Sequence, residues 1–510
     1  MARKKSLCWL FAALAITVLA SACTVSSSRL QSESSPSSAS PLPTTKVTPT
    51  AKPNIIFVLT DDLSWNLVRF MPHVLQMQKT GATFSNYFVT DSLCCPSRAS
   101  IFTGEFPHDT GVYRNSGTDG GFSAFQAHQN ETHTFATSLS AQHYQTAMMG
   151  KYLNKYDPTV PVDGQLPYVS PGWSTWDVAD RHGYREFGYT LAQNHQDFAY
   201  SDQANAYLTD VLSTKAQAFV NQSAQTHQPF MLEVASFAPH APYVPAPRDA
   251  TKFPGLTAPR TPAFAHRVKN APNWLASIPP LKSKDFKKIN RDFQKRAQSV
   301  LAVDDMIGRL QAEVQALGLS QNTYFVFSSD NGYHMGEYNL RPGKQTAFDT
   351  DIRVPLIVTG PGVPAGKTIG AMTQNIDLAP TFDQLGGATP PPSVDGNSLV
   401  ALWRGQPQPD WRNAVLVEHH GPTKDTADPD YTGPLSGNPP GYEAIRTPTS
   451  LYVEYSTGER EYYNTVADPY ELDNIAASLS PTLLAKYHKA LVKMEHCHGQ
   501  ASCWAAQHFS

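Results

Sequence analysis

The sequence predicts an α/β protein with a smaller antiparallel sheet near its C-terminus, and three patterns support this prediction. Residues 54–59 form a continuous apolar run, which is typical of a strand buried on both faces. Residues 295–317 carry apolar side chains at helical spacing, and a second apolar run follows at residues 324–327. The alternating pattern of residues 451–455 favours a strand of a separate antiparallel sheet.

The beginning of the chain predicts export. Basic residues at positions 3–5 and the apolar run after them give residues 1–22 the features of a signal peptide, too short for a membrane span. Cys23 follows small residues, so either lipidation at Cys23 or plain cleavage before it fits. Residues 23–52 consist largely of Ser, Thr and Pro and predict a disordered tether. We therefore expect a cell-surface lipoprotein or a secreted protein that meets a membrane only through a lipid anchor.

The composition allows a large folded region and argues against nucleic acid as a partner. The chain has 510 residues, of which 41% are hydrophobic, enough to bury a sizeable core. We expect a catalytic domain over residues 53–405 and a C-terminal subdomain over residues 406–510. The formal net charge of −3 argues against a nucleic-acid-binding protein, which normally has a basic face. An anionic small-molecule substrate remains compatible, because a pocket needs only local Lys and Arg.

Polar side chains follow two of the predicted strands directly. Asp61 and Asp62 come after the first strand, and Asp330 and Asn331 come after the strand at residues 324–327. In open α/β sheets, ligands bind at the carboxyl ends of strands. Oxygen-only ligands suit Ca²⁺ or Mg²⁺ better than Zn²⁺, and the size of this set favours Ca²⁺. Two structural alternatives exist: Asp62 could cap the next helix, and the second segment could be an ordinary turn.

Residues 92–104 combine two thiols with a Pro, a hydroxyl and an arginine. Cys94 and Cys95 precede Pro96, and this order predicts the start of a helix. Free N–H groups at a helix start, together with the Arg98 guanidinium, favour an anion. The structural alternative is that adjacent cysteines are a disulfide partner and a spare, or buried thiols.

Two further cysteines lie near the C-terminus. Cys497 and Cys503 are close in sequence, and in an exported protein a small disulfide loop is their natural pairing. Two free thiols are the alternative.

The Cys94-x-Pro-Ser-Arg sequence, with Thr103-Gly104 shortly after it, resembles the signature of type I sulfatases, which depend on formylglycine. Longer stretches such as Gly-Lys-Tyr-Leu-Asn and Asp-Asn-Gly-Tyr-His resemble N-acetylglucosamine-6-sulfatases and extracellular heparan endosulfatases. The resemblance extends from Pro53 to Cys503. It implies an alkaline-phosphatase-like fold, with a mixed sheet between helices and a smaller C-terminal antiparallel sheet domain. It also implies hydrolysis of sulfate esters on a sulfated carbohydrate.

The resemblance implies a role for Cys94 and a complete metal site. A formylglycine-generating enzyme would convert Cys94 to formylglycine, whose hydrate is the nucleophile of the family. That hydrate would complete a metal site formed by Asp61, Asp62, Asp330 and Asn331.

Further residues match substrate-contacting positions of the family. Lys151, Lys344 and Arg98 would hold the sulfate, and His240 would protonate the leaving oxygen. Many members carry a His shortly after the first of these lysines, whereas this chain has Asn154, which would supply a hydrogen bond instead. His334 would face the substrate.

Two other functions also fit the sequence, and two segments are candidates for determining which substrate binds. A phosphonate monoester or phosphodiester hydrolase of the same superfamily can carry the same motif. A non-catalytic lipoprotein that binds sulfated glycans would keep Cys94 as a thiol. Residues 173–176 and 418–420 are candidates for loops that select the substrate.

Overall fold

The computed structural model describes residues 52–509. The signal peptide, the lipidation site at Cys23 and nearly all of the proposed tether therefore lie outside the described residues. Within residues 52–509, none of the helices combines the length and the apolar composition needed to span a lipid bilayer.

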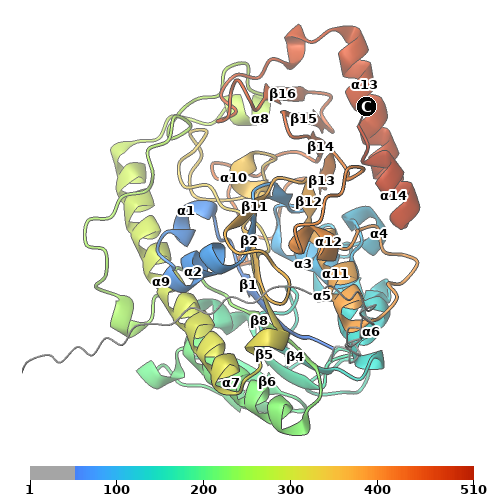
Figure 1. Cartoon of the computed structure of the whole chain (residues 1–510). Helices are drawn as coiled ribbons and strands as arrows, with labels where there is room; N and C mark the ends of the chain where they lie inside the picture. The colour runs from blue at the N-terminus through green and yellow to red at the C-terminus, as the bar shows by residue number, and fades with distance from the viewer. Residues whose placement is uncertain (1–51, 510) are drawn as a thin grey trace, which may run out of the picture. The chain divides into compact units, whose positions relative to one another are not determined.

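A ten-stranded mixed sheet forms the centre of the fold (Figure 1). Strand β1 pairs in parallel with both β8 and β9, whereas β10 runs antiparallel to β9 and to β2. The predicted mixed sheet between helices is confirmed. In spatial order the strands are β11 (Lys367–Ile369), β2 (Ala82–Phe84), β10 (Leu356–Thr359), β9 (Thr323–Ser329), β1 (Asn54–Thr60), β8 (Phe230–Ala235), β4 (Gln145–Gly150), β5 (Thr175–Ala179), β6 (Thr190–Gln193) and β7 (Gln196–Ala199).

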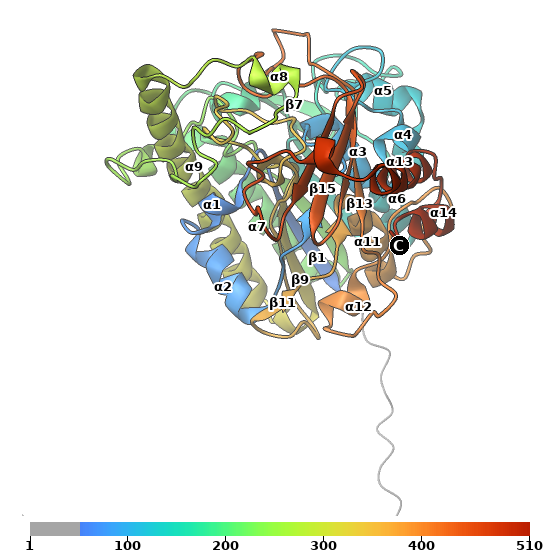
Figure 2. The ribbon, with the colours of Figure 1, turned by 90° about the horizontal axis from the view of Figure 1, so that it is seen from above.

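Helices cover both faces of this sheet, which explains why residues 55–59 of β1 are all apolar (Figures 1 and 2). Ile56 and Val58 pack in one hydrophobic core, and Ile55, Phe57 and Leu59 pack in another. The first core is covered by α1 (Trp65–Val68), α2 (Pro72–Thr80), α7 (Leu208–Thr226) and α9 (Ser283–Ala316). The second is covered by α3 (Cys94–Thr103), α5 (Gly121–Ala127), α6 (Phe135–Ala141), α11 (Leu378–Gly386) and α12 (Val400–Trp403).

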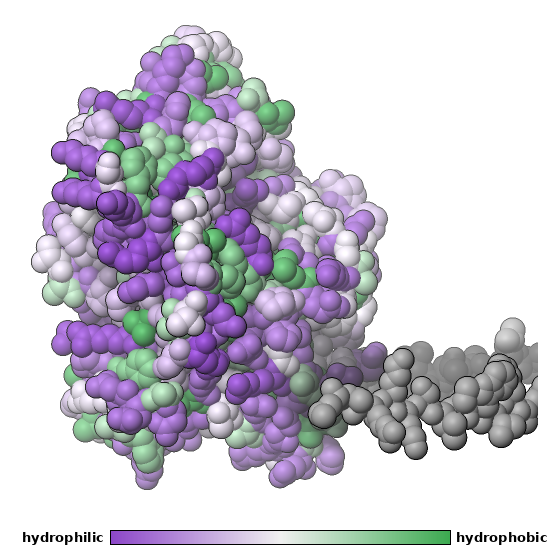
Figure 3. Space-filling view, turned by 90° about the vertical axis from the view of Figure 1, so that its left-hand side faces the viewer, coloured by the Kyte–Doolittle hydropathy of each residue, from purple (hydrophilic) through white to green (hydrophobic). Residues whose placement is uncertain are grey.

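Helix α9 begins at Ser283, well before residue 295, where the sequence predicted a helix. Its first turns are rich in lysine, and the buried positions start only at Ile289 and Phe293, so apolar spacing does not show them. The Asp285 carboxylate accepts the backbone N–H of Lys282 at 2.8 Å and closes this end of the helix. The face of the molecule on the α9 side is accordingly hydrophilic with scattered hydrophobic residues (Figure 3).

A second, smaller sheet of four antiparallel strands follows, as predicted. Its hydrophobic core also contains Phe106 and Ile376, which lie earlier in the chain, so the C-terminal region packs tightly on the rest. The boundary near residue 405 stays a prediction. The sheet consists of β13 (Val415–His419), β14 (Tyr442–Arg446), β15 (Ser450–Tyr455) and β16 (Arg460–Asn464), and α13 (Pro481–Glu495) and α14 (Gln500–Ala506) lie against it.

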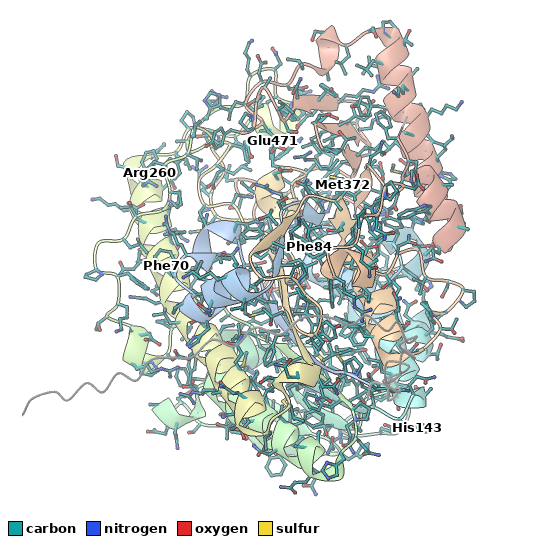
Figure 4. The ribbon with its side chains drawn as sticks, viewed as in Figure 1. Phe70, Phe84, His143, Arg260, Met372 and Glu471 are labelled. Carbon is teal, nitrogen blue, oxygen red and sulfur yellow. A yellow bond between two sulfur atoms is a disulfide. The ribbon has the colours of Figure 1, made fainter. Side chains whose placement is uncertain are left out.

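Cys497 and Cys503 are joined by a disulfide between α13 and α14. Side chains such as Phe84 and Met372 fill the interior, whereas His143 and Arg260 lie at the periphery (Figure 4). The remaining short elements are β3 (Tyr87–Phe88), α4 (Pro107–Thr110), α8 (Asn273–Ala276), α10 (Asp349–Ile352) and β12 (Thr373–Gln374).

Candidate active site

The carboxyl ends of β1 and β9 bring four oxygen-bearing side chains together. The two strands are parallel neighbours, with Thr60 opposite Ser329, so the residues after each strand leave the sheet side by side. The backbone N–H of Asp62 donates to Asp330 Oδ1 at 3.2 Å, and Asn331 Nδ2 donates to Asp62 Oδ1 at 2.7 Å. Asp61, Asp62, Asp330 and Asn331 are all buried.

Asp62 is not the cap of the following helix. The residue before α1 is Ser64, and Asp62 itself has φ = 64°, a left-handed conformation that is uncommon outside glycine. The Arg296 guanidinium donates to the Asp62 carbonyl and helps to hold this turn. Strained backbone of this kind is typical of functional sites, and here it turns the carboxylate toward Asn331.

Helix α3 begins at Cys94 and directs this side chain to the strand ends. Its Sγ lies 3.2 Å from Asp61 Oδ1 and 3.5 Å from Asn331 Oδ1. Cys95 instead packs in the hydrophobic core beside the large sheet. Both cysteines are free thiols within the part of the chain that the structure describes.

The Cys94 thiol lies in an environment that disfavours its anion. Complete burial raises its pKa well above the usual value, and the carboxylates of Asp330, Asp430 and Asp61 raise it further. Lys151 opposes this shift without cancelling it. In the chain alone, Cys94 is therefore a protonated thiol and a poor nucleophile.

Two lysines reach the same place from different parts of the large sheet. Lys151 follows β4, and its Nζ donates to Asp61 Oδ2 at 2.6 Å. Lys344 lies in the loop after β9, and its Nζ is 2.7 Å from Asp62 Oδ1 and 2.8 Å from Cys94 Sγ. Burial alone would lower the pKa of each lysine, but the surrounding carboxylates outweigh it and raise both pKa values. Both lysines are therefore charged.

Arg98 lies one helical turn after Cys94, and its guanidinium forms hydrogen bonds with other groups of the chain. Its Nε donates to Asp330 Oδ2 at 2.9 Å, and its Nη1 donates to the Lys151 carbonyl at 2.8 Å. The guanidinium thus fixes a metal-site carboxylate and the backbone that carries a lysine. Its Nη2 has no hydrogen-bond partner among the described residues.

His240 follows β8 and is held at both ring nitrogens. Its Nδ1 lies 2.6 Å from the Ala241 carbonyl, and its Nε2 lies 2.6 Å from Asp430 Oδ1. Burial lowers the pKa of His240, but Asp62, Asp430 and Asp61 outweigh it and raise the pKa to about 9. At neutral pH the ring is therefore an imidazolium, which carries the proton that a general acid needs.

Asp430 is the residue of this site that the sequence analysis missed. One oxygen, Oδ1, lies 3.2 Å from Cys94 Sγ and 2.7 Å from Lys344 Nζ. The other oxygen, Oδ2, accepts from Asn154 Nδ2 at 2.6 Å and from the Tyr184 hydroxyl at 3.1 Å. The available signal was a polar segment, Asp-Pro-Asp-Tyr-Thr-Gly, inside an unusually long gap between two predicted strands.

His334 lies beside this group rather than among its contacts. The ring is fully buried, and its Nδ1 is 3.0 Å from Asp351 Oδ2, a residue of α10. Burial lowers the pKa of His334, and Asp351 overcomes this effect and raises it. A substrate contact for His334 stays a prediction.

The two segments suggested as specificity loops belong in part to strands β5 and β13. Trp176 lies in β5 and is fully buried among Tyr152, Tyr156 and other aromatic rings. Glu418 lies in β13 and is buried against His108, at 2.9 Å. The suggestion was wrong for these side chains, because periodicity alone did not reveal that both segments pack against other layers of the fold.

The residues at the two strand ends fit a hard divalent cation. Ligand atoms of Asp61, Asp62, Asp330 and Cys94 all lie within 4.8 Å of one another, and all four side chains are buried. Three buried carboxylates this close repel each other unless positive charge lies between them. Carboxylate and amide oxygens are the ligands that such cations prefer. Asp430 and His240 form a second possible group with Asp61 and Asp62.

Comparison with known proteins adds evidence from sequence. The sulfatase family model matches residues 53–388, and the model "N-sulphoglucosamine sulphohydrolase, C-terminal" matches residues 336–496. The N-acetylglucosamine-6-sulfatase of Homo sapiens is 34% identical over 485 residues, covering 88% of this chain and 86% of that protein. The extracellular sulfatase SULF-1 homolog of Drosophila melanogaster is 33% identical over 380 residues, covering 72% of this chain and 33% of that protein.

Solved structures share the fold. A protein in complex with its substrate D-glucosamine-2-N,6-O-disulfate aligns with a TM-score of 0.72 and 23% identity, covering 87% of this chain and 97% of that one. The phosphonate monoester hydrolase of Agrobacterium radiobacter aligns with a TM-score of 0.64 and 20% identity, covering 86% and 95%. The same architecture therefore occurs around more than one hydrolytic site.

Proposed function

Because this chain belongs to the sulfatase family, we propose that it is a sulfuric ester hydrolase that releases sulfate from sulfated amino sugars of glycosaminoglycans. Its similarity to N-acetylglucosamine-6-sulfatase over most of both chains makes a 6-O-sulfated glucosamine the substrate that we propose first. The solved complex with a disulfated glucosamine supports the same class of sugar.

One observation carries this proposal most directly. Cys94 lies within hydrogen-bond distance of the Asp61 carboxylate, one of the proposed metal ligands, and of the buried ammonium group of Lys344. A residue at position 94 can therefore contact a cation and an anionic substrate at once. The same motif in a purely structural role would not require buried charges of both signs around one sulfur atom.

We propose that Asp61, Asp62, Asp330 and Asn331 hold Ca²⁺, with Mg²⁺ as the alternative of the same ligand class. A cation bound there would supply positive charge beside the nucleophile and the sulfate oxygens. Arg98 positions Asp330 for this task through its 2.9 Å contact. It acts on the metal ligand, while the lysines face the substrate.

We propose that Cys94 is converted to formylglycine by a formylglycine-generating enzyme. Such a residue supplies a hydrated aldehyde, whose one hydroxyl can attack sulfur while the other later expels the sulfate. The match of the sulfatase family model to the region that contains the Cys94-x-Pro-Ser-Arg motif supports this proposal.

The chain's own side chains then account for binding and proton transfer. Lys151 and Lys344 hold the sulfate oxygens and stabilise the charge that shifts during displacement. His240 binds the Ala241 carbonyl through Nδ1, and its Nε2, which contacts Asp430 Oδ1 at 2.6 Å, is the nitrogen that would protonate the departing sugar oxygen. Asn154 donates a hydrogen bond from the position where many family members carry a His.

A phosphonate or phosphodiester hydrolase remains the competing activity, because a phosphonate monoester hydrolase shares the fold. The relatives at 33–34% identity are sulfatases, and this favours sulfate esters. A protein that binds sulfated glycans without turnover could use the same lysines, but it would not need a conversion of Cys94. Export as a lipoprotein or as a secreted enzyme is part of the proposal and is compatible with the extracellular relative.

The test is a parallel assay of the purified protein. We expect cleavage of 4-nitrophenyl sulfate and of N-acetylglucosamine-6-sulfate, with at most weak cleavage of a phenylphosphonate ester. The Cys94→Ala variant is the control, and mass spectrometry of the peptide that contains residue 94 reports the conversion to the aldehyde. Efficient phosphonate cleavage without sulfate release would overturn the proposal.

A further inference from the structure

Residues 420–441 form an unusually long connection between two neighbouring strands. Strands β13 and β14 are antiparallel partners in the small sheet, with His419 opposite Tyr442. Such partners are normally joined by hairpin loops of about 2–5 residues, and much longer loops usually carry a function. Here the connection leaves its own sheet and reaches the carboxyl end of the large sheet, where Asp430 meets Lys344.

The base of this connection is fixed to the large domain, on the loop that carries Lys344. Gln345 exchanges hydrogen bonds with it, donating to Thr432 and accepting from Thr423 Oγ1 at 2.9 Å. Gly343 lies so close to the Ser436 carbonyl that a Cβ there would come within 1.9 Å of it. Between these fixed points, Lys155 forms ion pairs with Asp425 at 3.1 Å and with the buried Asp428 at 3.5 Å, and Asp430 reaches the site.

The Asp430 carboxylate occupies the position that the proposed reaction requires for the sulfate group. Its Oδ1 is 3.2 Å from Cys94 Sγ, 2.7 Å from Lys344 Nζ and 2.6 Å from His240 Nε2. Its Oδ2 takes the hydrogen bond of Asn154, at 2.6 Å. A sulfate ester cannot use these same donors while the carboxylate is present, because its oxygens would have to lie at the same points.

Charge explains why a carboxylate rests there. Lys344 and His240 contact this carboxylate at 2.7 and 2.6 Å, and a divalent cation on the metal carboxylates would add positive charge beside it. A buried excess of positive charge needs an anion. Asp430 is fully buried and supplies that anion from within the chain.

We propose that Asp430 is an internal competitor for the sulfate position, and that substrates bind only by displacing it together with residues 424–431, between the fixed residues Thr423 and Thr432. The proposal rests on the function proposed above and adds a selection step to it. A tethered group competes at an effective concentration on the order of millimolar or more. The carboxylate of a substrate, such as that of a uronic acid, can form only the contacts that Asp430 already forms. It therefore gains no binding free energy by displacing Asp430.

A sulfate ester differs from such a carboxylate in its number of acceptors. It offers three non-bridging oxygens, so it can engage Lys151 in addition to the contacts that Asp430 already makes. Lys151 Nζ donates to Asp61 at 2.6 Å, and no hydrogen bond to Asp430 is present among the described residues. Asp430 therefore favours sulfated over carboxylated positions of a glycan that carries both.

The test measures binding of inorganic sulfate in the presence of calcium by isothermal titration calorimetry. It uses the Cys94→Ser protein, which is chemically uniform and does not turn over. In this background we compare Asp430→Asn and Asp430→Ala with Asp410→Asn, an exposed aspartate outside the site. We expect both Asp430 variants to bind sulfate about tenfold more tightly than their parent, because no carboxylate of the chain occupies the sulfate position any longer. The Asp410 variant should bind sulfate as tightly as its parent.

Hydrogen exchange of the unsubstituted, converted enzyme gives an independent reading. Saturating sulfate should raise amide exchange in residues 424–431 if Asp430 is expelled. Equal or weaker sulfate binding by the Asp430 variants, or a segment whose exchange is unchanged or slowed by sulfate, overturns the inference. In those cases cleavage of sulfate esters by the unsubstituted enzyme continues, whereas failure of the proposed function abolishes that cleavage. If the variants do not fold, the exchange experiment decides alone.

Discussion

The ammonium group of Lys344 lies 2.8 Å from the sulfur of Cys94, although 250 positions separate the two residues in the chain. The same Nζ is 2.7 Å from Asp62 Oδ1, so one charge connects the proposed nucleophile with a proposed metal ligand. Both side chains are buried, which keeps this interaction from being screened by solvent.

Replacing Lys344 should therefore lower the rate of sulfate release more than it lowers the affinity of the protein for a glycan. We expect Lys344→Met to lower kcat/KM for a sulfate ester on the order of a hundredfold, the usual effect of removing one preorganised charged contact. Cys94→Ala should be far worse, because it removes the nucleophile itself. Steady-state kinetics on 4-nitrophenyl sulfate measure both, with Lys284→Met on the exposed side of α9 as a control. Near-normal activity of Cys94→Ala would show that the nucleophile lies elsewhere.

Removal of divalent cations should lower both activity and stability. Asp61, Asp62 and Asp330 are buried close together, and Lys151, Lys344 and Arg98 balance their charge only in part of the space around them, so a cation that binds between the three carboxylates stabilises the folded protein. We expect treatment with EDTA to abolish sulfate release and to lower Tm, and added Ca²⁺ to raise Tm in a concentration-dependent manner. Differential scanning calorimetry with Ca²⁺ and Mg²⁺ side by side measures the preference. A Tm that does not respond to either ion argues against the proposed metal site.

The role of His240 as a proton donor predicts a dependence on the leaving group. We expect His240→Gln to lower kcat on a sugar sulfate on the order of a hundredfold or more, because an alcohol is a poor leaving group without a proton. The loss on 4-nitrophenyl sulfate should be much smaller, since nitrophenolate needs little protonation. Equal losses on both substrates would mean that His240 binds the sulfate rather than protonating the oxygen.

Glu233 should make stability depend on pH. It lies in the middle of β8, fully buried, and neither carboxylate oxygen has a hydrogen-bond partner among the described residues. Burial raises its pKa from the ordinary 4.5 to about 8, although Arg98 lowers it in part. Between these pH values the unfolded chain loses a proton that the folded chain retains, so stability falls as pH rises through this window.

Glu233→Gln removes this dependence. Relative to the parent, the free energy of unfolding of the variant should improve between pH 5 and pH 8, by at most on the order of 5 kcal/mol. Chemical denaturation at both pH values measures the difference, with the exposed Asp202→Asn as a control. If the parent and the Gln variant lose equal stability over this range, Glu233 is ionised in the folded state.

Local patterns in the sequence were sufficient for much of the fold. The apolar run of β1 predicted burial on both faces, since helices on two sides leave no wet surface. The positions of the polar residues directly after β1 and β9 predicted that their side chains lie close together, because neighbouring parallel strands end at the same edge of a sheet. The first turns of α9 were missed because they are polar, and helical spacing of apolar side chains is visible only where the helix packs.

What the sequence by itself determined is the set of residues that periodicity and a contiguous motif can reveal, including the strand ends, a helix start close to Pro96 and the family to which the motif belongs. Only the tertiary structure decided that Arg98 holds Asp330 and that Asp430 enters the site from the small sheet. The physical reason is that these contacts join segments hundreds of residues apart, and a single carboxylate in a polar loop carries no periodic signal of the charges that it will meet.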